Sequence, residues 1–207
     1  MTTDQQVLDE LAASGPAGDH ALDDRLRARL VSDAVRAGLL DVAYRTVDSP
    51  LGPLLLAATP AGVVRVAFDR EDHDAVLEVL AERVSPRIMR APGRLEDAAR
   101  QLEGYFAGTR RDFDVAVDLR LARGFRRTVL DHLRVIPYGT TESYSVVAGA
   151  AGSPAAVRAV GSACATNPVP LIVPCHRVVR SDGGIGQYRG GTEAKRALLA
   201  MEASEPG

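Results

Sequence analysis

The sequence predicts an α+β fold in which an N-terminal antiparallel β-sheet with helices is followed by a mainly helical domain. Two observations support this prediction. Short segments rich in β-branched residues lie within residues 42–68, whereas helical spacing of apolar residues dominates after residue 124. With 207 residues, of which 46% are hydrophobic and 25% charged, the chain is typical of a globular protein with a substantial core.

An N-terminal extension, residues 1–40, precedes the predicted sheet and contains one amphipathic helix. Leucines recur every four residues from Leu22 to Leu30, which predicts a helix over residues 21–38. Gly38 is a typical residue to end it. Two interpretations stay open: the helix packs on its own domain, which the pattern favours, or it contacts another molecule.

The predicted α/β domain covers residues 41–119. It begins with three short runs, separated by turn residues, that read VAYRTV, PLLLAAT and GVVRVAF, and these predict an antiparallel meander. Helical spacing predicts helices over residues 71–84 and 95–107. Clean alternation predicts a further strand over residues 113–119, FDVAVDL.

The predicted helical domain covers residues 120–207. An amphipathic helix is expected for FRRTVLDHLRVI, which Pro137 ends. A short helix is expected for SYSVVAGAAG. A third should start at Ser153-Pro154, with serine as N-cap and proline at the first helical position. Two short helices joined by a glycine-containing turn are typical of a helix-turn-helix.

Charge is divided unevenly along the chain, although the formal net charge is only −2. Residues 1–85 carry 8 Lys/Arg against 15 Asp/Glu, whereas residues 86–207 carry 17 against 12. The C-terminal half is therefore basic, and contact with nucleic acid phosphates requires such a local basic surface. By itself this asymmetry does not distinguish a DNA-binding protein from one that never contacts DNA.

The composition bears on metal sites, disulfides and location. The chain has two cysteines, Cys164 and Cys175, and four histidines, which are too few for a disulfide framework or a structural zinc cluster. We therefore expect no metal. No apolar run reaches the length of a transmembrane helix, and the N-terminus lacks the basic and apolar regions of a signal peptide. The sequence predicts a cytoplasmic protein with no membrane partner.

The segment that points to chemistry is NPVPLIVPCHRVV, residues 167–179. Pro174 restricts the backbone directly before Cys175, and His176 and Arg177 add a hydrogen-bonding group and a positive charge. These features favour the thiolate, the reactive form of cysteine. From the residues alone, a reactive Cys175 and a buried inert one are about equally supported.

A series of motifs follows Arg123. In chain order they are PYG, SY, VRAVG, NPVP, IVPCHRVV, GxYxGGxxxK and LLAxE. This array closely resembles the O6-alkylguanine-DNA alkyltransferases, also called methylated-DNA–protein-cysteine methyltransferases. The resemblance is strongest over residues 124–202 and looser over residues 42–110, and residues 1–40 have no recognised counterpart. It implies that the N-terminal sheet domain is ribonuclease H-like.

The resemblance implies a DNA repair protein that transfers the alkyl group from O6 of guanine to its own cysteine, once per molecule. By position, Cys175 matches the alkyl acceptor. His176 matches the base that takes the thiol proton through a bound water, and Glu202 the residue that orients this histidine. Asn167 matches the asparagine that shapes the active-site turn.

The resemblance also implies substrate-binding roles for Tyr188, Val173 and Tyr144. Tyr188 matches a tyrosine near the guanine pocket whose hydroxyl can supply a proton as the base leaves. The thioether product is not a leaving group, so the reaction is irreversible and stoichiometric, with no metal and no organic cofactor. Activity on O4-alkylthymine is a further expectation that the sequence does not decide.

The implied partner is double-stranded DNA containing O6-alkylguanine, bound by a monomer. Because the target carbon lies inside the base stack, the nucleotide must be flipped out. Arg158 matches the arginine that fills the gap, and Tyr144 the tyrosine that pushes on the target phosphate. The family docks the second helix of its helix-turn-helix in the minor groove of DNA, where small residues permit a close approach. Contacts to the DNA backbone are expected from Ser145, Ser153, Ser181 and Arg126.

Three other functions compete with this interpretation. A relative that binds alkylated guanine without repairing it would lack the acceptor cysteine, and Cys175 is present. A cysteine hydrolase using Cys175 and His176 would need an oxyanion hole and would turn over repeatedly. A non-catalytic helix-turn-helix protein would leave Cys175 unmodified after contact with damaged DNA.

Overall fold

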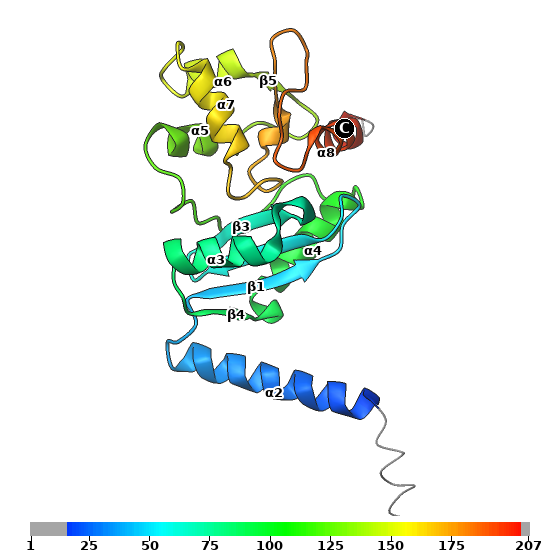
Figure 1. The fold of residues 1–207 in the computed structure, drawn as a ribbon. Coiled ribbons are helices and arrows are strands. Elements are labelled where there is room, and N and C mark those ends of the chain that lie inside the picture. Colours follow the sequence, from blue (N-terminus) through cyan, green and yellow to red (C-terminus); the bar gives the residue numbers. More distant parts are fainter. Residues whose placement is uncertain (1–15, 204–207) are drawn as a thin grey trace, which may run out of the picture. The chain divides into compact units, whose positions relative to one another are not determined.

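The computed structural model describes residues 16–203 (Figure 1). They belong to two compact units, one that ends at Leu40 and one that begins at Asp41. The predicted sheet, the predicted helical domain and every candidate site residue belong to the second unit. In the described part of the chain, no helix is both long enough and apolar enough to cross a membrane.

The first unit contains helix α2 (Pro16–Arg36), which confirms the helix predicted for this part of the chain. Gly38 follows with a φ of 66°, a conformation that favours glycine. The Leu39 N–H donates to the Ala34 carbonyl at 2.8 Å, which satisfies a carbonyl of the last turn. Gly38 therefore ends this helix as predicted.

A four-stranded sheet begins the second unit, in the order β3-β2-β1-β4. Its strands are β1 (Val42–Val47), β2 (Leu54–Thr59), β3 (Gly62–Phe68) and β4 (Ile88–Arg90). The first three pair antiparallel, which confirms the predicted meander. The fourth strand was not predicted and pairs with β1 in parallel. With three residues, β4 is too short to show a strand periodicity.

Helices cover both faces of the sheet. Residues Leu55 and Val64 point to the face that packs on Val76 and Leu80 of α3 (His73–Arg83). The opposite side chains of the same strands pack on α4 (Glu96–Phe106). Short 3₁₀ turns precede the two helices, η1 (Asp69–Glu71) and η2 (Pro92–Leu95). Because both faces are covered, β2 and β3 are apolar without strict alternation.

The strand predicted over residues 113–119 is wrong in its extent. Within the described residues, this segment forms one isolated parallel β-bridge, between Val63 and Val117, and no continuous strand. The two segments of the chain approach closely at Gly62. Its φ is 136°, and a Cβ there would lie 2.4 Å from the Ala116 carbonyl oxygen. The alternating side chains pack on the core without building a hydrogen-bonded ladder; they are Phe113, Val115 and Val117.

The helical part contains α5 (Phe125–Leu133), α6 (Tyr144–Ala150), α7 (Val157–Ala165) and α8 (Thr192–Ala203). Two short strands, β5 (Glu142–Ser143) and β6 (Val178–Val179), pair in parallel. The Ser143 hydroxyl accepts the Val146 N–H and caps α6. Helices α6 and α7 form the predicted helix-turn-helix (Figure 1).

The predicted start of the third helix at Ser153-Pro154 is wrong. The Ser153 N–H donates to the Ala148 carbonyl at 2.9 Å, so this serine closes the preceding helix and does not cap the next one. The Ala156 N–H then donates to the Ser153 carbonyl at 2.8 Å, which forms a turn. Helix α7 begins only after it, at Val157.

One hydrophobic core joins the sheet to the helical part. Leu54 and Val66 of the sheet belong to the same cluster as Val129 of α5 and as Cys175. The Val66 N–H also donates to the Pro168 carbonyl at 2.9 Å. The segment that carries the candidate acceptor is therefore held from both sides, by helices and by a strand.

Candidate active site

The segment before Cys175 is a loop held by one buried amide. The Asn167 Nδ2 donates to the Val173 carbonyl at 2.8 Å, and its Oδ1 accepts the Val169 N–H at 3.0 Å. The Cys175 N–H donates to the same Val173 carbonyl at 2.8 Å. Leu171, inside the loop, has a φ of 74°, which is rare for a residue with a side chain. Asn167 thus sits where a turn-shaping residue is required.

Cys175 begins the 3₁₀ turn η3 (Cys175–Arg177) and is 1% exposed. Burial raises the pKa of its thiol to about 11, although the Asn167 side chain and the Lys195 ammonium oppose this rise. At neutral pH the sulfur keeps its proton. A reaction through this sulfur therefore needs a base.

His176 directly follows Cys175 in the chain and is completely buried. Its Nε2 is 2.9 Å from Glu202 Oε1, and its Nδ1 has no partner among the described residues. Because an ionised carboxylate can only accept, Nε2 carries the proton and Nδ1 keeps its lone pair. Burial lowers the pKa of His176, against the hydrogen bond and the charge of Glu202. A neutral imidazole with a free Nδ1 is a base ready for use.

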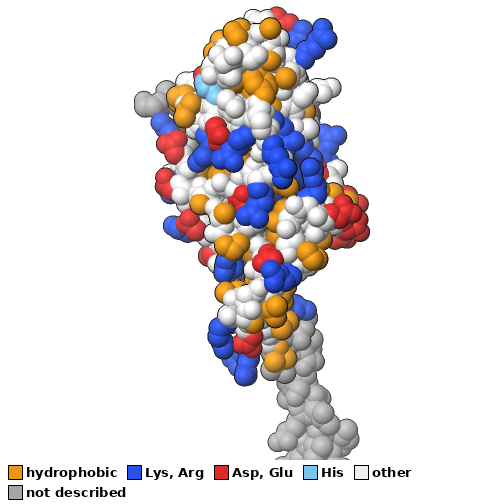
Figure 2. All heavy atoms as spheres, turned by 90° about the vertical axis from the view of Figure 1, so that its left-hand side faces the viewer, with side chains coloured by type: hydrophobic (Ala, Val, Ile, Leu, Met, Phe, Trp, Pro, Cys, Tyr) orange, Lys and Arg blue, Asp and Glu red, His pale blue; other side chains and the backbone are white. Residues whose placement is uncertain are grey.

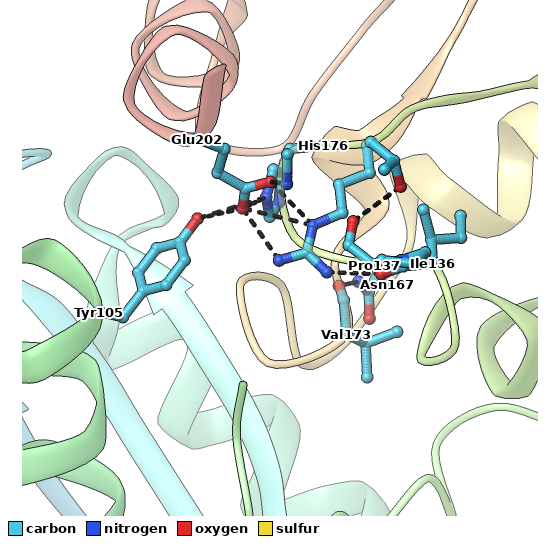
Figure 3. A network of polar contacts seen from close by, with 10 residues as sticks. Tyr105, Ile136, Pro137, Asn167, Val173, His176 and Glu202 are labelled. Carbon is cyan, nitrogen blue, oxygen red and sulfur yellow. Dashed lines mark hydrogen bonds and ion pairs between the residues drawn. The ribbon is translucent and has the colours of Figure 1, made fainter. Parts of the chain in front are cut away.

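Glu202, near the end of α8, accepts hydrogen bonds from side chains of three residues and from one backbone amide (Figure 3). Tyr105 donates its hydroxyl at 2.7 Å, Arg177 its Nε and Nη2 at 3.0 Å, and Gly139 its N–H at 3.1 Å. Burial raises the pKa of Glu202, but the bonds from His176 and Arg177 outweigh it and lower the pKa to about 2. The carboxylate is ionised at every physiological pH.

The network joins the two parts of the second unit. Tyr105 belongs to α4 on the sheet, whereas Glu202 belongs to the C-terminal helix (Figure 3). Arg177 also donates its Nη1 to the Ile136 carbonyl at 2.6 Å, which ties the end of η3 to the segment after α5. His176 is therefore oriented by a group that is itself fixed from several elements.

Lys195 of α8 is a buried cation at the same site, with no exposed surface. Its Nζ donates to the Val178 carbonyl at 2.5 Å and lies 5.9 Å from the centre of the Tyr144 ring. Burial lowers its pKa, whereas the thiols of Cys164 and Cys175, when ionised, raise it. A negative charge on the Cys175 sulfur is consequently stabilised by a nearby ammonium.

Two tyrosines complete the site. The half-buried Tyr144 begins α6, and a Cβ at Gly186 would lie 2.6 Å from its hydroxyl; burial raises its pKa to about 12. Tyr188 packs edge-on against Phe68 and His176, with ring centres 5.5 and 6.2 Å apart. Its hydroxyl is buried without a partner among the described residues, and burial raises its pKa well above the usual value. Both phenols stay protonated at neutral pH.

The predicted DNA-contacting residues are spread more widely. Arg158 is exposed on the first turn of α7, and Ser145 is exposed on α6, where it shares a hydrogen bond with Ser143. Ser153 lies in the turn between these two helices. Ser181 lies beyond β6, and Arg126, on α5, donates to the Leu121 carbonyl. With Tyr144, the first residue of α6, the structure thus places four of the six on the helix-turn-helix; the exceptions are Ser181 and Arg126.

Two site residues, Tyr105 and Lys195, were missed from the sequence. Arg177 was noted there only as a positive charge that favours the thiolate, whereas the structure pairs it with Glu202. Lys195 lies inside a quoted motif, so its position carried a signal, although a cation there is easily taken for a surface charge. Tyr105 fits the apolar face of its helix, and nothing in the sequence marks its hydroxyl. Within residues 16–203, no group of three or more His, Cys, Asp and Glu side chains is placed to hold a metal ion.

Comparisons with known proteins cover most of the second unit. A family profile described as 6-O-methylguanine DNA methyltransferase, ribonuclease-like domain, matches residues 42–119. The DNA binding domain of the same family matches residues 124–204. The methylated-DNA–protein-cysteine methyltransferase of Mycobacterium tuberculosis is 42% identical over 163 residues, 79% of this chain and 93% of the relative. That of Methanosarcina barkeri is 38% identical over 162 residues, 77% and 96%.

Solved structures give the same result. The fold is similar to that of a Mycobacterium tuberculosis O6-methylguanine methyltransferase, with a TM-score of 0.71 and 40% identity over 80% of this chain and 95% of the other. It is also similar to the Mycobacterium tuberculosis protein OGT in complex with DNA, with a TM-score of 0.68 and 39% identity over 78% and 93%.

Proposed function

The chain belongs to the 6-O-methylguanine DNA methyltransferase family, and on that premise we propose that Cys175 is its alkyl acceptor. The protein is a DNA repair enzyme that reverses O6-alkylguanine lesions by irreversible transfer of the alkyl group to its own cysteine. The observation that supports Cys175 is its neighbour in the chain: the buried thiol is followed directly by a buried, neutral histidine whose Nδ1 has no partner among the described residues. Cys164, the other cysteine, is buried on α7 without such a base.

The first step is proton removal. His176 Nδ1 takes the thiol proton, through a water as the family resemblance implies, and becomes an imidazolium. The ionised Glu202, 2.9 Å from Nε2, stabilises that positive charge. The Lys195 ammonium stabilises the thiolate. The new charges therefore form where opposite charges are already fixed.

The second step is displacement at carbon. The Cys175 thiolate attacks the alkyl carbon, the carbon–sulfur bond forms, and the bond to guanine O6 breaks with its electron pair left on the base. A phenol protonates the departing base, and the imidazolium returns its proton to the phenolate. The balance is thiol plus alkylguanine to thioether plus guanine. Tyr188 is the residue matched to this role. Tyr144 is the second candidate, because its side chain is only half-buried, whereas that of Tyr188 is buried.

The DNA is held by the helix-turn-helix. A base inside the duplex cannot reach a thiol that is 1% exposed, so the nucleotide must be flipped out of the stack. We propose that Arg158, exposed on the first turn of α7, fills the gap that the base leaves. Small residues follow on the exposed side of α7, which permits close approach in the minor groove; they are Gly161, Ser162 and Ala165.

Intact-mass analysis after incubation with a duplex containing O6-methylguanine tests the acceptor. We expect a gain of one methylene per chain, mapped to the peptide that contains Cys175. Cys164→Ala is the matched control and should gain the same mass, whereas Cys175→Ala should gain none. A methyl group found on another residue would refute the assignment of Cys175. An unchanged mass with the lesion intact would refute repair itself.

Domain limits, location and substrate range follow as further proposals. We propose two domains, residues 41–119 and 120–207, because the two family profiles meet between residues 119 and 124. We also propose a cytoplasmic monomer, since transfer to the protein's own cysteine requires only one copy. O4-methylthymine in the same duplex tests whether the pocket accepts the second lesion.

A further inference from the structure

A groove lined by arginines lies apart from the acceptor cysteine, between α3 and the ends of α5 and α7. It has a volume of about 350 Å³. We call it the arginine groove and define it by Arg65, Arg83, Arg126, Arg189 and Glu71. Blue side chains gather across the middle of the face that Figure 2 shows, the side on which α3 and α5 lie in Figure 1.

The one carboxylate of the arginine groove is already fully used. Glu71 Oε2 accepts short hydrogen bonds from Arg65 and from Arg189. Its Oε1 accepts the Phe68 N–H at 3.0 Å. Glu71 is thus shared by two guanidinium groups, and it neutralises only one of them.

The remaining two cations have no carboxylate. For Arg83 and Arg126, the structure gives no ion pair within residues 16–203. Arg126 donates one Nη to the Leu121 carbonyl at 2.6 Å, while its Nε is buried without a partner. Burial lowers the pKa of Arg126, and repulsion from Arg83 and Arg189 lowers it further. Like charges held together in this way destabilise the protein unless an anion joins them.

The position of the arginine groove indicates which anion it binds. Thr166 lines it and is the residue at which α7 ends. Arg189 lines it too and directly follows Tyr188 of the base pocket. An adjoining hollow of about 310 Å³ contains Ala165, the last residue of α7, together with the exposed Arg70. The basic surface is therefore continuous with the helix that enters the DNA.

We propose that the arginine groove binds backbone phosphates of the DNA beside the lesion, so that the sheet domain as well as the helix-turn-helix holds the substrate. Guanidinium groups bind phosphate oxygens in pairs, and such contacts fix the register of a protein on the duplex without reading sequence. An acidic protein segment would suit the charge equally, but the continuity with α7 favours DNA. The inference rests on the DNA-binding part of the proposed function and not on the choice of Cys175.

The test is the salt dependence of binding to an undamaged duplex, measured by fluorescence anisotropy on the full chain. Each phosphate contact that is lost lowers the slope of log K against log salt by about 0.9. We expect Arg83→Gln/Arg126→Gln to lower that slope by about 1 to 2 for every duplex sequence. The matched control is Arg94→Gln/Arg100→Gln, which removes the same charge from η2 and α4, on the other face of the sheet. It should keep the wild-type slope.

Each outcome is decisive. A slope that falls in the groove variant and not in the control supports the proposal. Equal slopes in all three proteins overturn it. Equal slopes are also the result expected if the groove binds an acidic protein segment in place of DNA. Thermal unfolding shows whether each variant is folded; removing mutually repelling charges should not lower the melting temperature of the groove variant. If methyl transfer fails to map to Cys175 while the slope still falls, the acceptor is refuted and the groove is not.

Discussion

Replacing Tyr105 by phenylalanine tests whether a residue of α4, the helix packed on the sheet, controls His176, the proposed base. The Tyr105 hydroxyl lies 2.7 Å from Glu202 Oε1 and 3.4 Å from His176 Nε2. The ring packs on neighbouring aromatic rings with centres 5.3 to 6.1 Å away. Phenylalanine keeps this packing and removes only the hydroxyl, so the change isolates one hydrogen bond.

The size of the effect follows from the network. A hydrogen bond to a charged group contributes roughly 1.5–3 kcal/mol. Without it, Glu202 is less stabilised as an anion and holds the His176 Nε2 proton more strongly, which raises the pKa of His176. The other donors to Glu202 stay in place. We therefore expect only a part of this free energy, about 1 kcal/mol, to appear as stronger binding of the proton by His176. That corresponds to a pKa increase of about 0.7.

The assay is the rate of methyl transfer from an O6-methylguanine duplex with protein in excess, measured from pH 5 to pH 9. In the proposed mechanism neutral His176 is the base, so the rate should rise with pH through the pKa of this residue. The Tyr105→Phe midpoint should therefore lie at higher pH than the wild-type midpoint. Below the midpoint, the rate should fall about fivefold, which is the same pKa difference expressed as a ratio.

Tyr44→Phe is the matched control, since Tyr44 is half-buried on the face of the sheet that packs on α3. Its profile should coincide with that of the wild type. If Tyr105→Phe lowers the melting temperature but leaves the midpoint unchanged, Tyr105 is only a packing residue. The reasoning about Glu202 is then wrong.

Three further predictions concern charge and backbone. The pKa of Glu202 falls from an ordinary 4.5 to about 2, so its stabilisation is complete above about pH 4.5 and is lost as the pH falls towards 2; urea unfolding at pH 6 and pH 3 should show this loss, and Glu202→Gln should lack it. Lys195→Met removes the ammonium that favours the thiolate, so the pKa of the Cys175 thiol should rise above about 11, and iodoacetamide labelling followed against pH should shift upward. Gly62→Ala places a Cβ 2.4 Å from the Ala116 carbonyl oxygen at a φ of 136°, and chemical denaturation should show a loss of at least about 2 kcal/mol; an unchanged midpoint would mean that the two segments separate easily.

The sequence was sufficient where a pattern is local. Helices α3, α4 and α5 have apolar spacing over two or three turns, and each lies where it was predicted. The segment of residues 113–119 has strand alternation, but only one bridge forms, because alternation reports which side chains are buried and not whether a partner strand runs alongside. The start of α7 was misplaced for a similar reason. Ser153 lies between two helices and could either end the first or cap the second, and its N–H bonds to the end of α6.

The same distinction applies to the site. Cys175, His176 and Glu202 were predicted from motifs, because each lies in a recognisable segment. Tyr105 bonds to a residue 97 positions later, and no spacing rule connects two such positions. Only the packing of α4 against the helical part brings the two together. Residues that adjust the chemistry from another element are therefore the ones that a single sequence conceals.

The structure explains how a protein used only once can keep its cysteine intact until it meets DNA. A thiol with a pKa of about 11 is almost wholly protonated at neutral pH, and it is also 1% exposed, so dissolved electrophiles meet neither a thiolate nor an open path. A cysteine with a lowered pKa would react faster with DNA, but it would also be consumed by any alkylating agent. Here the proposed base His176, the Glu202 carboxylate that accepts its Nε2 proton and the Lys195 ammonium are already in place, while the sulfur stays neutral. Deprotonation is then productive only when an alkyl carbon lies against the sulfur, which makes placement of the flipped base the step that starts the chemistry.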